Sequence, residues 1–290
     1  MSAAYVHPEA LAETGWLAEH LDDPQVRALD ATYFLPAMKR NPRAEYQRAH
    51  IPGAGFFDID AVSDRASSLP HMLPSPEAFA AAVGALGVGN GNRVVVYDGL
   101  GLMSAARAWW MFRVFGHDDV AVLNGGLPKW RGEGWPVTDA RTRHAATSFT
   151  ARYRPELVTG IGEIRDRVAT GAPKLVDGRA AERFSGAAEE VWPGRRRGHI
   201  PGSHNLPYTD LIDPERKTLL PADAIRDRFA AAGVDLDRHG ERRWSCSCGS
   251  GITACAVALG AFLIGYPDVA VYDGSWAEWG LPGDTPVATA

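Results

Sequence analysis

The strongest constraint on the fold is that the chain repeats itself once. Ala49-His50-Ile51-Pro52-Gly53 recurs as Gly198-His199-Ile200-Pro201-Gly202, which places the two histidines 149 residues apart. Residues 122–130 and 271–279 keep the same spacing. A solenoid would repeat at a much shorter period. The 290 residues therefore predict two copies of one domain, and this length also suits two domains of ordinary size.

Within each copy, short β-branched runs alternate with alanine-rich helical segments. Arg93 and Arg242, which begin equivalent runs, are also 149 residues apart. Such alternation predicts an α/β fold of two tandem domains, each a mostly parallel sheet flanked by helices. The sequence predicts strands at 26–30, 93–97, 120–123, 174–177, 242–246 and 269–272, and helices at 77–86, 104–115, 222–232 and 252–264. We expect an N-terminal domain at 1–138, a polar linker at 139–156 and a C-terminal domain at 157–290.

Charge and cysteine content narrow the possible functions. A net charge of −5 and an isoelectric point near 6.0 argue against nucleic acid as a partner. No apolar stretch is long enough for a membrane span, and no secretory signal pattern is visible. All three cysteines lie between 246 and 255, without the histidine spacing of a zinc site. The clustering favours a reactive site in a reducing compartment, which we expect to be the cytoplasm.

Cys248 is the strongest candidate for a reactive residue. It follows an expected strand and precedes an apolar helix, with Gly249 and Gly251 in the loop between. This order places the thiol in a ring of backbone N–H groups at a helix start, which stabilises negative charge. Because the thiolate is the reactive form of cysteine, the sequence predicts an enzyme that does chemistry on sulfur through Cys248.

Taken together, these segments resemble the tandem rhodanese-domain sulfurtransferases. The His-Ile-Pro-Gly segments, the Asp273-Gly274-Ser275-Trp276 ending and the Cys-x-x-Gly-x-Thr loop are features of that family. The neutral loop Cys248-Gly249-Ser250-Gly251-Ile252-Thr253 resembles the mercaptopyruvate branch, whereas the thiosulfate branch typically carries a basic loop. The resemblance implies that only the second domain is catalytic. The first-domain counterpart, Asp98 to Met103, contains no cysteine.

The resemblance also implies a mechanism and a set of site residues. Cys248 would take sulfur from 3-mercaptopyruvate as a persulfide, release pyruvate and pass the sulfur to an acceptor, without a metal or organic cofactor. Ser250, His71 and Asp60 would handle protons, with Asp60 orienting His71. Arg183 would bind the substrate carboxylate. The expected substrate-binding residues are Arg183, Gly249, Gly251, Ile252 and Thr253, together with Arg195, Arg196 and Arg197.

One position departs from the family pattern. The mercaptopyruvate branch usually carries a second arginine nine residues after the one that Arg183 matches, and this chain has Trp192 there. The run Arg195 to Arg197 is a possible source of the missing charge, and is equally interpretable as a solvated loop. The expected partners are a small anionic sulfur donor and a thiol acceptor, such as thioredoxin or a small thiol.

Three alternatives remain open at the level of sequence. A thiosulfate sulfurtransferase would use a dianionic donor, and a persulfide carrier would hold sulfur without turnover. A phosphatase would need Cys-x5-Arg, but the sixth residue after Cys248 is Ala254. Cys246 and Cys255 are interpreted as core residues, and a redox partnership between Cys246 and Cys248 is left open.

Overall fold

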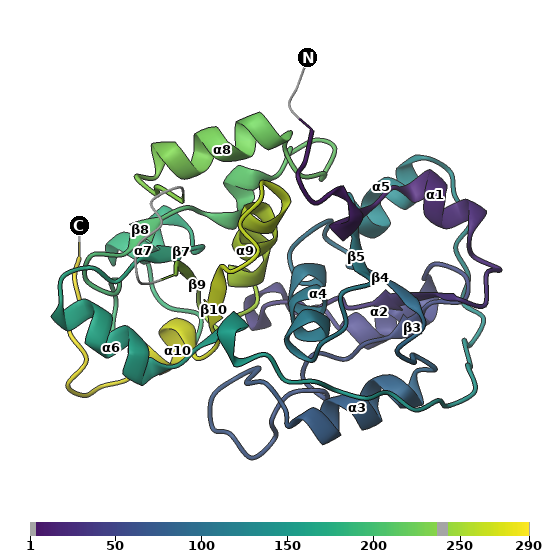
Figure 1. The fold of residues 1–290 in the computed structure, drawn as a ribbon, viewed down its shortest axis with the longest axis horizontal. Helices are drawn as coiled ribbons and strands as arrows, with labels where there is room; N and C mark the ends of the chain where they lie inside the picture. The colour runs from purple at the N-terminus through teal and green to yellow at the C-terminus, as the bar shows by residue number, and fades with distance from the viewer. Residues whose placement is uncertain (1–3, 237–242, 290) are drawn as a thin grey trace.

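Two five-stranded parallel sheets form the two halves of the molecule (Figure 1), and the computed structural model describes residues 4–236 and 243–289. The first sheet has the strand order β1-β5-β4-β2-β3 and the second β6-β10-β9-β7-β8. The two orders are the same once the second sheet is renumbered, and all strand pairs are parallel. The predicted pair of α/β domains is therefore confirmed.

The first domain contains β1 (Leu11–Ala12), α1 (Thr14–Glu19), β2 (Val26–Asp30), α2 (Pro42–Arg48), β3 (Gly55–Phe56), α3 (Pro76–Ala85), β4 (Arg93–Tyr97), α4 (Ala105–Val114), β5 (Val120–Leu123) and α5 (Gly126–Gly132). The second contains β6 (Val158–Thr159), α6 (Ile161–Ala169), β7 (Leu175–Asp177), α7 (Ala181–Ser185), β8 (His204–Asn205), α8 (Ala222–Ala231), β9 (Ser245–Ser247), α9 (Ala254–Leu263), β10 (Ala270–Tyr272) and α10 (Ser275–Trp279). Short 3-10 turns lie at Pro8–Ala10, Pro36–Met38, Pro155–Leu157 and Tyr208–Leu211.

Each predicted element corresponds to an observed one, with small shifts at the ends. β2, β4 and β5 have the predicted bounds, whereas the helix predicted at 252–264 begins at Ala254. The edge strands β1, β3, β6 and β8 are only two residues long, too short to show an alternating pattern in the sequence. Arg242, predicted to begin a strand, lies outside the described residues.

The strand before the reactive loop is offset by one residue from the rest of the repeat. Val96 pairs with Val122, whereas Cys246 pairs with Val271, so β4 and β9 are related by 150 residues and β5 and β10 by 149. Helices α4 and α9 again begin 149 residues apart. The spacing of 149 residues predicted between the strands that begin at Arg93 and Arg242 was therefore wrong by one residue. The loop after β9 is one residue shorter than the loop after β4.

Helices α4 and α9 pack against each other at the centre of the molecule (Figure 1). Every residue of α4 is buried, and so are nearly all residues of α9. Helix α9 is apolar on all sides and α4 is apolar apart from Arg107 and Arg113, and such helices are stable only when they are covered on all sides. These two helices therefore join the halves through one continuous hydrophobic core.

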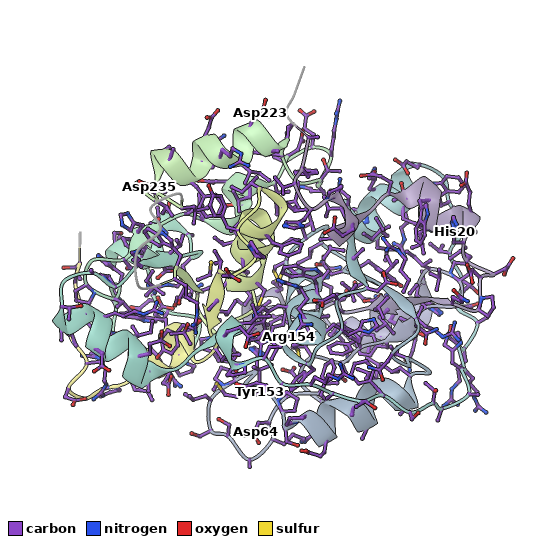
Figure 2. All side chains as sticks on the ribbon, in the orientation of Figure 1. His20, Asp64, Tyr153, Arg154, Asp223 and Asp235 are labelled. Carbon is purple, nitrogen blue, oxygen red and sulfur yellow. The ribbon has the colours of Figure 1, made fainter. Side chains whose placement is uncertain are left out.

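The connecting segment 139–154 has no helix or strand and runs along the first domain. Its backbone is tied by hydrogen bonds from Thr147 to Gly84 and from Arg152 to Phe115. Tyr153 and Arg154 mark where it reaches the second domain (Figure 2). The limits of the linker, 139–156, stay a prediction. No helix within the described ranges is long and apolar enough to cross a membrane.

Candidate active site

Cys248 lies at the carboxyl end of β9, where a parallel sheet places its functional groups. Its side chain is buried, and the residue is 2% exposed. The Cys248 N–H donates to Ser275 Oγ at 3.1 Å, and its carbonyl accepts from the Trp276 N–H at 3.0 Å. Ser275 has φ 50°, which aims its hydroxyl at this N–H while it donates to the Tyr272 carbonyl. The start of α10 thus fixes the backbone of Cys248.

The loop from Cys248 to Thr253 presents unpaired backbone donors. In the described part of the chain, the N–H groups of residues 249–253 donate to no protein acceptor. Gly251 has φ 78°, and a Cβ there would lie 2.7 Å from the Asp273 carbonyl oxygen. Only glycine fits this turn without strain. The predicted ring of N–H groups around Cys248, ready to bind an anion, agrees with this geometry.

His71 and Asp60 form the predicted pair in the first domain. His71 Nε2 lies 3.0 Å from Asp60 Oδ1, and the His71 ring is buried. His71 Nδ1 is also buried and has no hydrogen-bond partner within the described ranges. The imidazole packs edge-on against Tyr33 and against Trp192, with ring centroids 4.8 and 5.6 Å apart. Trp192 of the second domain therefore lies beside the proton-handling pair.

Arg107 joins this pair to the loop of the second domain. Its guanidinium donates to the carbonyl of His71 and, at 3.3 Å, to the carbonyl of Gly251. The same group forms a buried ion pair with Asp273 at 2.6 Å, and Asp273 also accepts from the Leu73 N–H. A buried charge is stable only when it is paired in this way. The His71 backbone and the reactive loop are thus held by one cation across the domain interface.

Ser250, the third member of the predicted proton-handling set, is buried in the loop. No hydrogen bond joins its hydroxyl to His71 in the described structure. The structure therefore brings Asp60 and His71 into direct contact and places Ser250 near them only through the loop that Arg107 holds.

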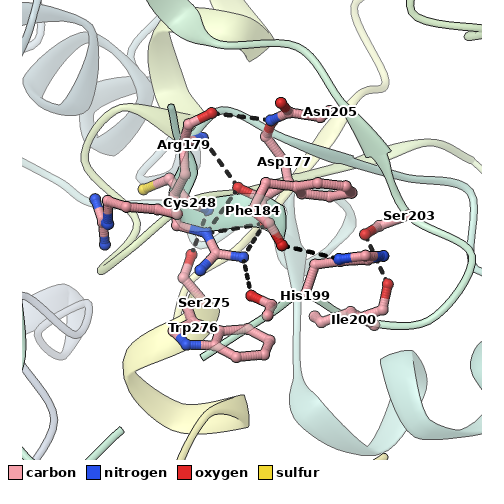
Figure 3. A network of polar contacts seen from close by, with 12 residues as sticks. Asp177, Arg179, Phe184, His199, Ile200, Ser203, Asn205, Cys248, Ser275 and Trp276 are labelled. Atoms are coloured by element: carbon pink, nitrogen blue, oxygen red, sulfur yellow. Dashed lines mark hydrogen bonds and ion pairs between the residues drawn. The ribbon is translucent and has the colours of Figure 1, made fainter. Parts of the chain in front are cut away.

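Arg183 lies directly over the loop. A Cβ at Gly249 would be 2.9 Å from Arg183 Nη2, so the glycine permits the close approach. Arg183 also pairs with Glu190, a carboxylate that is 2% exposed and that accepts from Arg179 at 2.6 Å. Figure 3 shows Arg179 in turn held by Asp177 close to Cys248. The guanidinium expected to bind substrate thus shares its charge with a buried carboxylate.

The arginine run beyond Trp192 is engaged elsewhere. Arg195 donates to the carbonyl of Ala277, and Arg196 donates to the carbonyls of Trp279 and Thr285. Arg197 pairs with the exposed Glu189. These contacts tie the loop to the C-terminal segment, and a substrate-binding role for the run stays a prediction.

The other two cysteines are in the core, as expected. Cys246 lies on β9, where burial raises the pKa of its thiol well above its usual value. Burial likewise raises the pKa of Cys255, whose Sγ donates to the Gly251 carbonyl at 3.1 Å. Neither thiol is suited to act as a thiolate nucleophile. The described residues contain no group of side chains arranged to hold a metal ion.

Sequence reasoning missed the residues that support the site from a distance. Arg107, Arg179, Glu190, Asp273 and Tyr208 were not predicted. Burial, followed by the negative charges of Asp98 and Cys248, raises the pKa of Tyr208 to about 12. The repeat contained a signal for two of the residues around Cys248. The first copy has Gly126 where the second has Ser275, and Thr32 where the second has Arg179. Differences between the copies mark the catalytic half.

Comparisons with known proteins agree with this geometry. The Rhodanese-like domain family matches the chain twice, over residues 13–133 and 161–281. The human 3-mercaptopyruvate sulfurtransferase is 44% identical, over 93% of this chain and 91% of that protein. Thiosulfate/3-mercaptopyruvate sulfurtransferase 2 of Arabidopsis thaliana is 43% identical, over 96% and 86%. The crystal structure of the Escherichia coli 3-mercaptopyruvate sulfotransferase SseA superposes with a TM-score of 0.83 at 39% identity, covering 93% of this chain and 99% of that one.

Proposed function

The chain belongs to the rhodanese family, and from that premise we propose that it is a 3-mercaptopyruvate sulfurtransferase with Cys248 as the nucleophile. The observation that carries the proposal is a single thiol in a ring of unpaired N–H groups, with Arg183 against the same loop. The family resemblance supplies the reaction, and the geometry supplies the residues.

In the first step, the Cys248 thiolate attacks the thiol sulfur of 3-mercaptopyruvate. A sulfur–sulfur bond forms and the carbon–sulfur bond breaks, with its electron pair leaving as the enolate of pyruvate. The outer sulfur remains on Cys248 as a persulfide, and protonation of the enolate gives pyruvate. The N–H groups of residues 249–253 stabilise the anionic sulfur, because they have no other acceptor.

In the second step, an acceptor thiolate attacks the outer sulfur and restores the Cys248 thiolate. Thioredoxin, a small thiol or, in an assay, cyanide would serve as the acceptor. Cys246 and Cys255 take no part, because burial keeps both thiols protonated. The clustered free cysteines also suit a reducing compartment, and we place the activity in the cytoplasm.

Proton transfer is assigned to His71. Asp60 binds Nε2 and so fixes the ring orientation, which leaves Nδ1 as the nitrogen without a protein partner. We assign to that nitrogen the exchange of a proton with the substrate thiol or with the enolate. Asp60 acts through His71 and is a positioning residue.

The charge of the site favours a monoanionic sulfur donor over a dianionic one. The loop residues after Cys248 are neutral, and Arg183 is half-neutralised by Glu190. Trp192 adds an apolar ring beside His71. Thiosulfate would therefore meet too little positive charge, whereas one carboxylate fits Arg183. An alternative is use of both donors, as the name of the Arabidopsis relative describes for that protein.

The test is sulfur transfer to cyanide with 3-mercaptopyruvate and thiosulfate side by side. We expect kcat/KM to favour mercaptopyruvate. Arg183→Ala should raise KM for mercaptopyruvate by about 10- to 100-fold, as loss of a charged hydrogen bond predicts. Trp192→Arg should raise kcat/KM for thiosulfate, and Trp192→Phe is its matched control.

Three outcomes would contradict the assignment. Preference for thiosulfate in the wild type would show that other charges set donor choice. An unchanged KM in Arg183→Ala would remove this residue from the site. Recovery of persulfidated protein that completes a single turnover only would favour a sulfur carrier.

A further inference from the structure

The first domain contains a cavity of about 250 Å³ at the carboxyl end of its sheet. Asp30 and Thr32, both buried, line its inner part together with Gly99 and Leu127. Asp30 accepts a hydrogen bond from the Thr32 N–H at 2.9 Å and forms no ion pair within the described ranges. A buried carboxylate without a cation is unusual.

The second domain shows what fills the equivalent space there. The Arg179 side chain lies between Asp177 and Trp276, with its guanidinium 2.7 Å from Asp177 Oδ2 and 4.5 Å from the indole ring centre (Figure 3). The same guanidinium donates to the Gly198 carbonyl at 2.9 Å. A carboxylate, a carbonyl and an aromatic face thus surround one planar cation.

Asp177, Gly198 and Trp276, three of the neighbours of Arg179, have equivalents around the first-domain cavity, whereas its fourth partner, Glu190, is not among the matched positions. The strand pairing and hydrogen bonds match Asp30 with Asp177 and Thr32 with Arg179, because both carboxylates accept from the N–H two residues later. The N–H of Leu127 binds the Asp98 carbonyl as that of Trp276 binds the Cys248 carbonyl. The matched positions are Asp30, Thr32, Ala49, Gly99 and Leu127, equivalent to Asp177, Arg179, Gly198, Gly249 and Trp276. At the position of Arg179 this domain has Thr32, so no side chain at that position supplies a guanidinium to Asp30.

The mouth of the cavity carries the opposite charge. Arg40 and Arg131 line it, and the Arg40 side chain is 37% exposed. Arg40 is paired with Glu45, which also lines the cavity, and Arg131 donates to the Ala49 carbonyl at 3.4 Å. A carboxylate at the inner end and guanidinium groups at the mouth match a ligand with a cation at one end and an anion at the other.

We propose that this cavity binds a small zwitterion whose guanidinium or ammonium group contacts Asp30 and whose carboxylate faces Arg40 and Arg131. The site is separate from the Cys248 loop, and its ligand takes no part in sulfur transfer.

Titration calorimetry of the full chain with guanidinoacetate tests the proposal. We expect saturable binding, about tenfold weaker for methylguanidinium, which lacks the carboxylate. Asp30→Asn should lower the affinity by about tenfold or more, because a neutral amide replaces the charged acceptor. Thr32→Arg should abolish binding by supplying the guanidinium from the chain itself.

Two further variants keep the test decisive. Leu127→Trp narrows the cavity as Trp276 does in the second domain, and it should abolish binding even if Thr32→Arg fails to fold. Arg183→Ala should bind guanidinoacetate like the wild type, which excludes the donor site. No saturable binding at millimolar guanidinoacetate, equal binding in Leu127→Trp, or loss of binding in Arg183→Ala would each overturn the proposal.

Discussion

The loops that follow β4 and β9 occupy equivalent places and use their backbone donors in opposite ways. In the first domain, the Asp98 carboxylate accepts from the N–H groups of Leu100, Gly101, Ser104 and Ala105, each at 2.8 Å. In the second domain, Cys248 stands at the equivalent position, and the N–H groups of residues 249–253 donate to no acceptor among the described residues. The Asp98 carbonyl is bound by the start of α5 and the Cys248 carbonyl by the start of α10, so the two positions correspond.

The difference shows how a catalytic loop is distinguished from a structural one. The first loop already contains its anion, and the buried donors stabilise the fold. The second loop keeps the same donors for an anion that forms during the reaction, which stabilises the intermediate instead. Asp98 therefore indicates where the charge on the Cys248 sulfur is bound.

The largest expected effect separates activity from stability at Cys248. Cys248→Ser should lower kcat by ~10⁴-fold or more, because the hydroxyl is a poor sulfur nucleophile. Cys248→Asp should be equally inactive but more stable than wild type, because its carboxylate can enter the ring as Asp98 does. Sulfur transfer to cyanide measures the activity of each variant, and thermal melts measure its stability. Turnover in Cys248→Ser would disprove the mechanism, and a less stable Cys248→Asp would show that the loops are not equivalent.

At Asp98 we expect the opposite result, a loss of stability without a loss of activity. Asp98→Ala removes the acceptor of four buried N–H groups and should lower the free energy of unfolding by about 4–5 kcal/mol. Sulfur transfer per folded molecule should stay unchanged. Urea denaturation measures the loss, with Cys248→Ala as the matched control, for which we expect a small change. Equal destabilisation by both variants would contradict the comparison.

His71 and Lys217 extend the comparison to the segments that cover the loops. Both residues have positive φ, 61° and 60°, and each is followed after one residue by a leucine whose N–H binds the other domain. His71→Asn should lower kcat by about 10²–10³-fold and flatten the pH–rate profile, whereas Lys217→Asn should change neither. Asparagine tolerates this backbone conformation, so both variants should fold. An unchanged pH–rate profile in His71→Asn would make His71 structural.

The smallest expected effect concerns Asp30 and its counterpart Asp177. Burial, with a smaller contribution from Asp98, raises the pKa of Asp30 from 3.8 to about 6. Because this pKa is higher in the folded state, the contribution of Asp30 to stability is present below pH 4 and is lost as the pH rises through 6. Asp30→Asn should therefore exceed wild-type stability above pH 6 by about 2–3 kcal/mol, with no gain below pH 4.

Unfolding measured against pH checks this prediction. Asp177→Asn is the matched control and should be less stable than wild type at neutral pH, because it weakens the acceptor of the buried Arg179. A loss of stability in Asp30→Asn above pH 6 would show that this carboxylate has a cation partner.

Much of the fold and part of the site were predictable from local sequence. β2, β4 and β5 were predicted with their observed bounds because buried strands have a strong local signal. Cys248 was predicted from its loop, and Arg183, His71 and Asp60 from the family resemblance. Arg183 and Cys248 lie at one loop, and His71 and Asp60 form one pair. Arg107, Glu190 and Asp273 were not, because their roles depend on partners distant in sequence.

The sequence by itself determined the duplication, the parallel α/β architecture and the single copy of the nucleophile, because repeats, strand–helix alternation and residue identity are local properties. Only the tertiary structure decided that β9 is offset by one residue, that Asp98 fills the first loop, and that Arg107 binds His71 and Gly251 together. These features are set by how two domains pack around α4 and α9. A buried charge or N–H group takes whichever partner that packing brings within reach.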